Sequence, residues 1–247
     1  MKLTFLGTGK GGYPTLERNC CAIMLECGDG IYLIDAGAPV LDLMTRLEAP
    51  FEKIRGVFTT HMHCDHTAGL PAFLTTCSWR YTDSSFDVFL TEDRGITAMK
   101  ELILAMDKVF HEDRIRLKKA EPGVIYTDEN VTVTAIPTMH CQPYPSYAYM
   151  FEGEGKRVIF SGDLRRPDAL DFPAVVRDEL SDAFVCELCH FSTDTIFPII
   201  AECPTKKVFF NHVGGRVVSE TLAAVKDFAA TVSMEVFAPD DGDSYLI

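Results

Sequence analysis

The sequence predicts a single α/β domain of two packed sheets flanked by helices. Short strand-like runs alternate with helical patterns along its 247 residues, a length that suits one large domain or two small ones. No linker rich in proline and serine, low-complexity tract or internal repeat divides the chain. We therefore expect residues 1–247 to form one domain with a sizeable buried core.

The expected strands are frequent and short. They are Leu3–Leu6, Cys21–Cys27, Ile31–Ile34, Val57–Thr60, Asp87–Leu90, Val131–Ile136, Ser146–Phe151, Arg157–Ser161, Ala183–Cys186, Lys207–Asn211 and Ser244–Ile247. The expected helices place apolar residues three or four positions apart, as Ile96, Met99 and Ile103 do. They are Leu41–Leu47, Ala68–Thr76, Ile96–Val109, Ala174–Leu180, Ile196–Glu202 and Ser219–Ala229.

Residues 79–119 show the least regular sheet pattern. Within them, residues 94–119 carry 7 basic and 4 acidic side chains, a local excess of positive charge. We interpret 79–119 as a candidate lid or dimerisation segment. If it is a dimerisation segment, the protein would form a homodimer. An ordinary solvated helix is the alternative, because charged helical faces usually contact water.

The composition is that of a soluble globular protein, with 47% hydrophobic and 24% charged residues. No apolar run approaches the roughly 20 residues that a bilayer span needs, and Lys2–Leu6 is far too short for a secretory signal. The chain has nine cysteines, an odd number, and they are scattered along the sequence. This distribution does not indicate a disulfide framework. We expect a cytoplasmic protein with reduced thiols and no membrane partner.

The charge bears on the kind of partner. The net charge is −13, of which residues 1–120 carry −2 and residues 121–247 carry −11. Proteins that bind nucleic acid neutralise its phosphates with lysine and arginine, so a polynucleotide is not expected as a partner. A small anionic substrate remains compatible with this charge.

One cluster of side chains carries the chemistry. His61, His63, Asp65 and His66 fall within six residues directly after the strand Val57–Thr60. Imidazole and carboxylate groups suit zinc and related divalent metals, and so dense a cluster without a cation would leave repelling or unpaired charges. Strand alternation sends the first two histidines the same way, whereas the last two residues begin a helix and point elsewhere. The arrangement predicts two metals.

Further ligands are available at the ends of later strands. His140, Asp163 and His212 each follow an expected strand, where loops open at the edge of a sheet. With the four residues of the first cluster they make seven candidate ligands, which is enough for two metals.

On these residues the chain resembles the metallo-β-lactamase superfamily of hydrolases, whose hallmark is the H-x-H-x-D-H signature. The similarity also includes Phe5-Leu6-Gly7-Thr8-Gly9, Leu33-Ile34-Asp35-Ala36-Gly37, Gly69-Leu70-Pro71, His140, Ser161-Gly162-Asp163 and His212. The resemblance implies a four-layer αββα sandwich of two mixed sheets flanked by helices. It also implies that one metal is held by His61, His63 and His140, the other by Asp65, His66 and His212, with Asp163 bridging them.

Within the superfamily, one branch is more similar than the others. The residues concerned are Gly7-Thr8-Gly9, Arg18-Asn19, Asp163, Glu187 and His190, and the branch is that of phosphodiesterases, including ribonuclease Z and cyclic phosphodiesterases. Cys186 precedes Glu187 where ribonuclease Z has a histidine, and no Gly/Pro-rich arm for gripping tRNA is evident. The resemblance therefore implies a phosphodiesterase of a small anionic ester, with tRNA processing as an alternative.

The expected reaction is attack by a hydroxide shared between two divalent cations, which we expect to be zinc, with manganese or iron as alternatives. Asp65 and Asp163 are the expected catalytic carboxylates. His190 is a candidate donor of a proton to the leaving group, and a buried structural histidine is the alternative. We interpret Asp35 as a carboxylate that orients a ligand histidine.

Other activities remain open. A thioester, lactone or sulfate-ester hydrolase of the same fold is one alternative, because two metals polarise a carbonyl equally well. A non-enzymatic metal-binding regulator is another. Arg165 and Arg166 follow the Asp163 turn and are either phosphate partners or ordinary surface charges.

The glycine-rich opening, residues 7–12, matches G-x-G-x-x-G but lacks the helix that a dinucleotide site needs, since Pro14 and the strand Cys21–Cys27 follow. We expect this loop to line the metals with its backbone.

Overall fold

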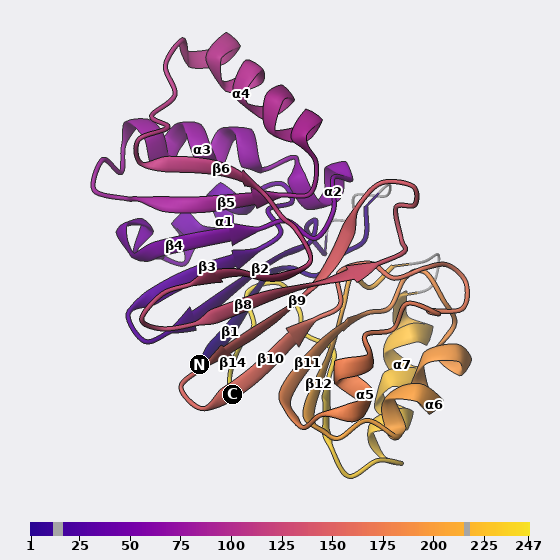
Figure 1. Cartoon of the computed structure of the whole chain (residues 1–247). Coiled ribbons are helices and arrows are strands. Elements are labelled where there is room, and N and C mark those ends of the chain that lie inside the picture. Colours follow the sequence, from indigo (N-terminus) through magenta and orange to yellow (C-terminus); the bar gives the residue numbers. More distant parts are fainter. Residues whose placement is uncertain (12–16, 215–217) are drawn as a thin grey trace.

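The computed structural model describes residues 1–11, 17–214 and 218–247. Two seven-stranded mixed sheets pack face to face, and helices cover their outer faces (Figure 1). The predicted four-layer αββα sandwich is confirmed. Gly12 and Pro14, which the analysis of the glycine-rich opening used, lie outside the described residues.

The first sheet combines an antiparallel half with a parallel half. From edge to edge its strands are β14 (Ser244–Leu246), β1 (Lys2–Gly7), β2 (Ala22–Cys27), β3 (Gly30–Ile34), β4 (Ile54–Phe58), β5 (Phe86–Leu90) and β6 (Ile115–Lys119). Pairing is antiparallel from β14 to β3 and parallel from β3 to β6. Its helices are α1 (Val40–Arg46), η1 (Phe51–Lys53), α2 (Cys64–Thr67), α3 (Leu70–Trp79) and α4 (Asp93–Asp107).

The second sheet repeats this design. From edge to edge its strands are β13 (Glu235–Phe237), β12 (Thr205–Asn211), β11 (Ser181–Glu187), β10 (Lys156–Phe160), β9 (Ser146–Gly153), β8 (Thr132–Thr138) and β7 (Gly123–Thr127). Pairing is antiparallel from β7 to β10 and parallel from β10 to β13. Its helices are α5 (Ala174–Asp178), α6 (Thr193–Ala201) and α7 (Val218–Ala229).

Three apolar layers fill the spaces between the four structural layers. β3 shows how the sequence produces them. Its Tyr32 and Ile34 belong to the layer between the sheets, whereas Ile31 and Leu33 belong to the layer under the helices of the first sheet. A strand covered on both faces needs an unbroken apolar run, and β3 has one.

Three strands were not predicted, namely β6, β7 and β13. The segment 79–119, in which we expected little regular sheet, contributes β5, α4 and β6 to the first half of the sandwich. Its role as a lid or dimerisation segment stays a prediction. Among the residues with described structure, no helix has the length and apolar character needed to cross a membrane.

Candidate metal centre

The candidate ligands follow the ends of strands in both sheets. After β4 come His61, His63 and the short helix α2, which carries Asp65 and His66. The others follow strands of the second sheet: His140 comes after β8, Asp163 after β10 and His212 after β12. The structure brings all seven predicted residues to one place.

Asp163 lies at the centre of this cluster and is almost fully buried. Its Oδ2 atom is 3.7 Å from His61 Nε2, 3.5 Å from His66 Nε2 and 3.6 Å from His140 Nε2. Its Oδ1 atom is 3.6 Å from His212 Nδ1. Two donors bound tetrahedrally to one zinc ion at about 2.05 Å lie about 3.4 Å apart. The spacing around Asp163 is therefore close to that of ligands sharing a cation.

The other donors form two groups around it. In the first, His63 Nδ1 lies 3.0 Å from His61 Nε2 and 3.3 Å from His140 Nε2. In the second, His212 Nε2 lies 3.2 Å from both His66 Nε2 and Asp65 Oδ2. These groups consist of the same residues as the two half-sites that the superfamily resemblance implies, and metal binding by each group stays a prediction.

Asp35 orients His66, as predicted. Its Oδ2 atom lies 2.7 Å from His66 Nδ1, on the side of the ring opposite the cluster, and its Oδ1 atom accepts the backbone N–H of Thr60 at 2.7 Å. The residue follows β3 in the left-handed region, with φ of 59°. Because Nδ1 donates to this carboxylate, Nε2 is the nitrogen left to bind a metal.

Two more histidines are held in the same way. His61 Nδ1 lies 3.0 Å from Thr60 Oγ1, and His140 Nδ1 lies 3.1 Å from the carbonyl oxygen of Leu164. In each ring the other nitrogen, Nε2, faces Asp163. This division of the ring nitrogens is typical of metal-binding histidines.

The carboxylates and imidazoles of the cluster shift one another's pKa values. Burial would lower the pKa of His66, but the carboxylates of Asp163 and Asp35 outweigh it and raise that pKa well above its usual value. Burial would raise the pKa of Asp163, but His212 and His66 outweigh it and lower that pKa. Burial lowers the pKa of His61. For Asp163 and His61 these shifts favour the ionised carboxylate and the neutral imidazole, which are the forms that bind metals, whereas His66 must lose its proton when it binds a cation.

His190 lies beside the centre, with its Nδ1 3.6 Å from Asp163 Oδ2 and its ring centroid 4.5 Å from that of His140. The buried carboxylate of Glu187 lies 3.0 Å from this Nδ1 and also accepts backbone N–H groups, including those of Leu164 and His190. Glu187 is thus occupied in holding His190 and the loop after β11. Proton donation by His190 stays a prediction.

The arginines are not directed at the cluster by any contact that the structure shows. Arg165 forms two hydrogen bonds to the carboxylate of Asp168, at 3.1 and 2.7 Å, and Arg166 is exposed. The alternative of an ordinary surface ion pair therefore describes Arg165.

The glycine-rich loop contacts the centre through its backbone, as predicted, since Gly11 donates its N–H to Asp65 Oδ2 at 2.9 Å. A Cβ atom on Gly11 would lie 2.1 Å from Asp65 Cγ, so this approach needs glycine. Sequence reasoning missed the anchor of the loop. Asp241 accepts hydrogen bonds from the backbone N–H groups of Thr8 and Asn19.

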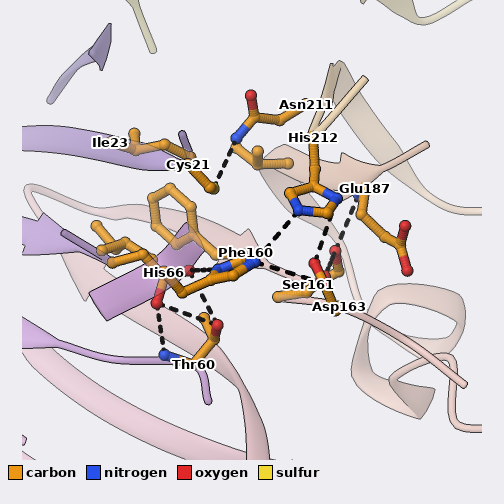
Figure 2. A pocket seen from close by; sticks show the side chains of 14 residues that line it. Cys21, Ile23, Thr60, His66, Phe160, Ser161, Asp163, Glu187, Asn211 and His212 are labelled. Atoms are coloured by element: carbon orange, nitrogen blue, oxygen red, sulfur yellow. Dashed lines mark hydrogen bonds and ion pairs between the residues drawn. The ribbon is translucent and has the colours of Figure 1, made fainter. Parts of the chain in front are cut away.

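Behind the cluster lies a cavity of about 20 Å³ between the sheets, next to His66, Asp163 and His212 (Figure 2). It has room for about one water molecule and none for a substrate. His63 and Cys64, by contrast, are exposed. Among the described residues of the cluster, the side of His63 is therefore the one open to solvent.

The sandwich and its centre define a metallo-β-lactamase fold. The metallo-β-lactamase fold protein YhfI of Bacillus subtilis superposes with a TM-score of 0.76 at 19% identity, covering 99% of both chains. The short form of human tRNase Z superposes with a TM-score of 0.75 at 20% identity, covering 100% of this chain and 99% of that one.

Sequence comparison identifies the family within this fold. Residues 1–195 match the family described as Anti-Pycsar protein Apyc1, and the chain belongs to that family. Ribonuclease Z of Methanocaldococcus jannaschii is 34% identical over 155 residues, which are 62% of this chain and 47% of the relative. The chain spans about half the length of the curated relatives it matches. The predicted superfamily and its ribonuclease Z branch are confirmed.

Proposed function

We propose that the protein is a hydrolase dependent on two divalent cations, and that it cleaves a phosphodiester bond in a small anionic substrate. The observation that carries the proposal is the placement of the Asp163 carboxylate 3.5–3.7 Å from nitrogens of four histidines, in a buried position. Its phosphodiester part is supported by similarity to relatives named ribonuclease Z.

The donor set fits cations of the zinc type, which bind imidazole nitrogen and carboxylate oxygen. His61, His63 and His140 would hold one ion, and Asp163 would bridge to the second. Asp65, His66 and His212 would hold that second ion. Manganese and iron accept the same donors, so the choice of metal is part of the test.

Bound cations supply Lewis acidity and make water a nucleophile near neutral pH. The protein contributes position and protons. Gly11 and His212 hold the carboxylate of Asp65 in place. Hydrolysis breaks a P–O bond, and the departing oxygen needs a proton. His190, whose Nδ1 is held by Glu187, is the group beside the centre that can give one from Nε2.

The charge distribution supports a small substrate. The segment 94–119 has a local excess of positive charge that could contact a polyanion, yet five of its seven basic side chains form ion pairs. Most of the acidic partners lie just outside it, and residues 87–121 together carry 7 basic and 8 acidic side chains, a net charge of −1. Such a surface has few cations to exchange for the counterions of a phosphate backbone.

Processing of tRNA is the second candidate function. Similarity to curated ribonuclease Z proteins, at 31–34% identity, favours it. Cleavage of a precursor tRNA and of a cyclic nucleotide should be compared at two salt concentrations. Activity confined to the small ester, with little dependence on salt, supports our proposal, whereas efficient and strongly salt-dependent cleavage of the tRNA contradicts it.

The metal requirement and the reaction class are tested together. The protein should contain about two zinc, manganese or iron ions per chain and hydrolyse a chromogenic phosphodiester faster than thioester, lactone or sulfate esters. His63→Ala should lower metal content and activity in parallel. His111→Ala is the matched control, because His111 is a half-buried histidine that pairs with Asp113 and is not among the candidate ligands. A folded protein that takes up no metal would refute the proposal.

A further inference from the structure

The five histidines of the centre differ in what holds the ring nitrogen turned away from the other donors. In His61, His66 and His140 that nitrogen has an oxygen partner. In His63 it is Nε2, because Nδ1 is the atom that faces His61 and His140. The neighbour of His63 Nε2 is sulfur, since Cys141 Sγ lies 3.9 Å away.

We propose that Cys141 is a positioning residue for His63. Its sulfur accepts a hydrogen bond from the Nε2–H group and so presents Nδ1 to a cation in the first half-site. The inference rests on the metal centre of the proposed function. It gives Cys141 the part that Asp35 has for His66.

Two features make this contact consequential. The rings of His61 and His66 are buried, so packing restrains them in addition to their hydrogen bonds, whereas His63 is exposed and depends more on its hydrogen bond. Cys141 is itself fixed by a turn in which Tyr144 donates its backbone N–H to the Cys141 carbonyl at 2.8 Å. The thiol is therefore presented by a defined stretch of backbone directly after the candidate ligand His140.

The sulfur contacts the nitrogen of His63 that the other imidazoles leave free. Cys141 Sγ lies within 4.8 Å of a nitrogen of each of His61, His63 and His140. Its hydrogen-bond contact is to Nε2 of His63, whereas Nδ1 is the nitrogen that faces the two other imidazoles. A cation held by Nδ1 would leave Nε2–H available to the sulfur, and the cobalt spectrum described below separates this role from direct ligation.

Zinc affinity tests the inference. Zinc would be titrated into the metal-free full chain against a chromophoric chelator, for the wild type, Cys141→Ala and Cys141→Ser. We expect Cys141→Ala to weaken one of the two zinc constants by about 10–100-fold, as loss of an outer partner does. Cys141→Ser should restore most of that affinity, because a hydroxyl also accepts from Nε2–H. Cys203→Ala, which removes a buried thiol beside α6, should match the wild type.

The outcomes separate the two proposals. Wild-type protein that binds neither zinc, manganese nor iron overturns both of them. Two normal zinc constants in Cys141→Ala overturn the role of Cys141 and leave the proposed function standing. In the cobalt-substituted protein, a sulfur-to-metal charge-transfer band that is lost in Cys141→Ser would make the thiolate a direct ligand, which also overturns the positioning role. Equal unfolding midpoints of the metal-free proteins, with weaker zinc binding only in Cys141→Ala, support it.

Discussion

Replacing Asp35 by asparagine should weaken metal binding at the second half-site without disturbing the backbone. Asp35 accepts hydrogen bonds from three donors: His66 Nδ1–H and Thr60 N–H, each at 2.7 Å, and the Thr60 hydroxyl at 2.9 Å. Asparagine has a single acceptor oxygen, so its amide group must face one of these donors with N–H groups of its own. Its left-handed φ of 59° is one that asparagine adopts readily, so the exchange adds little strain.

The expected cost follows from the partner that is lost. Removing an outer partner of a metal-binding histidine costs about 10–100-fold in affinity, or about 1.4–2.7 kcal/mol. A buried donor left without an acceptor costs about 1–3 kcal/mol of stability as well.

Chelator competition measures the first effect, and urea unfolding of the metal-free protein measures the second. Asp42→Asn, on the exposed side of α1, is the control. Zinc constants in Asp35→Asn that equal those of the wild type would refute the reasoning.

Three further predictions concern other residues. Asp163→Ala should reduce bound metal and kcat/KM more than His63→Ala does, by about 100-fold or more in kcat/KM, because it touches both half-sites. Burial would raise the pKa of Asp128, but two tyrosine hydroxyls and two backbone amides outweigh it and lower that pKa. Asp128→Asn should therefore cost about 1–2 kcal/mol in urea unfolding at about pH 7, a difference lost as pH falls below about 3.9 through the lowered folded-state pKa. Equal acid sensitivity of both proteins would contradict this. Arg165→Ala should leave kcat/KM for a small phosphodiester within about twofold of wild type, since Asp168 already holds the guanidinium.

The fold was predictable wherever strands are covered on both faces. The three missed strands, β6, β7 and β13, lie at sheet edges. An edge strand has solvent beside it, so its sequence need not be apolar, and charged side chains there discourage pairing with other chains. β6, with Arg116, Lys118 and Lys119 in five residues, is such a strand. Its sequence alone resembles a solvated loop.

The candidate ligands could be predicted because four metal-binding side chains within six residues are rare, and because the others follow strands. Apart from Asp35, the residues that hold these ligands and the glycine-rich loop in place could not be predicted. Asp241 anchors the glycine-rich loop from more than 200 residues away, and Cys141 meets His63 only after the sheets pack. Neither residue stands in a pattern, so only the folded chain shows what it contacts.

Each half-site draws donors from both sheets. His61 and His63 follow the first sheet and His140 the second, while the other half-site combines Asp65 and His66 with His212. Each bound cation would therefore act as a cross-link between the halves of the molecule. A ligand that binds only the folded chain stabilises it by an amount that grows with the logarithm of its free concentration. The melting temperature of this protein would then rise with the free concentration of metal. A chelator would destabilise the folded sandwich as well as abolish its activity.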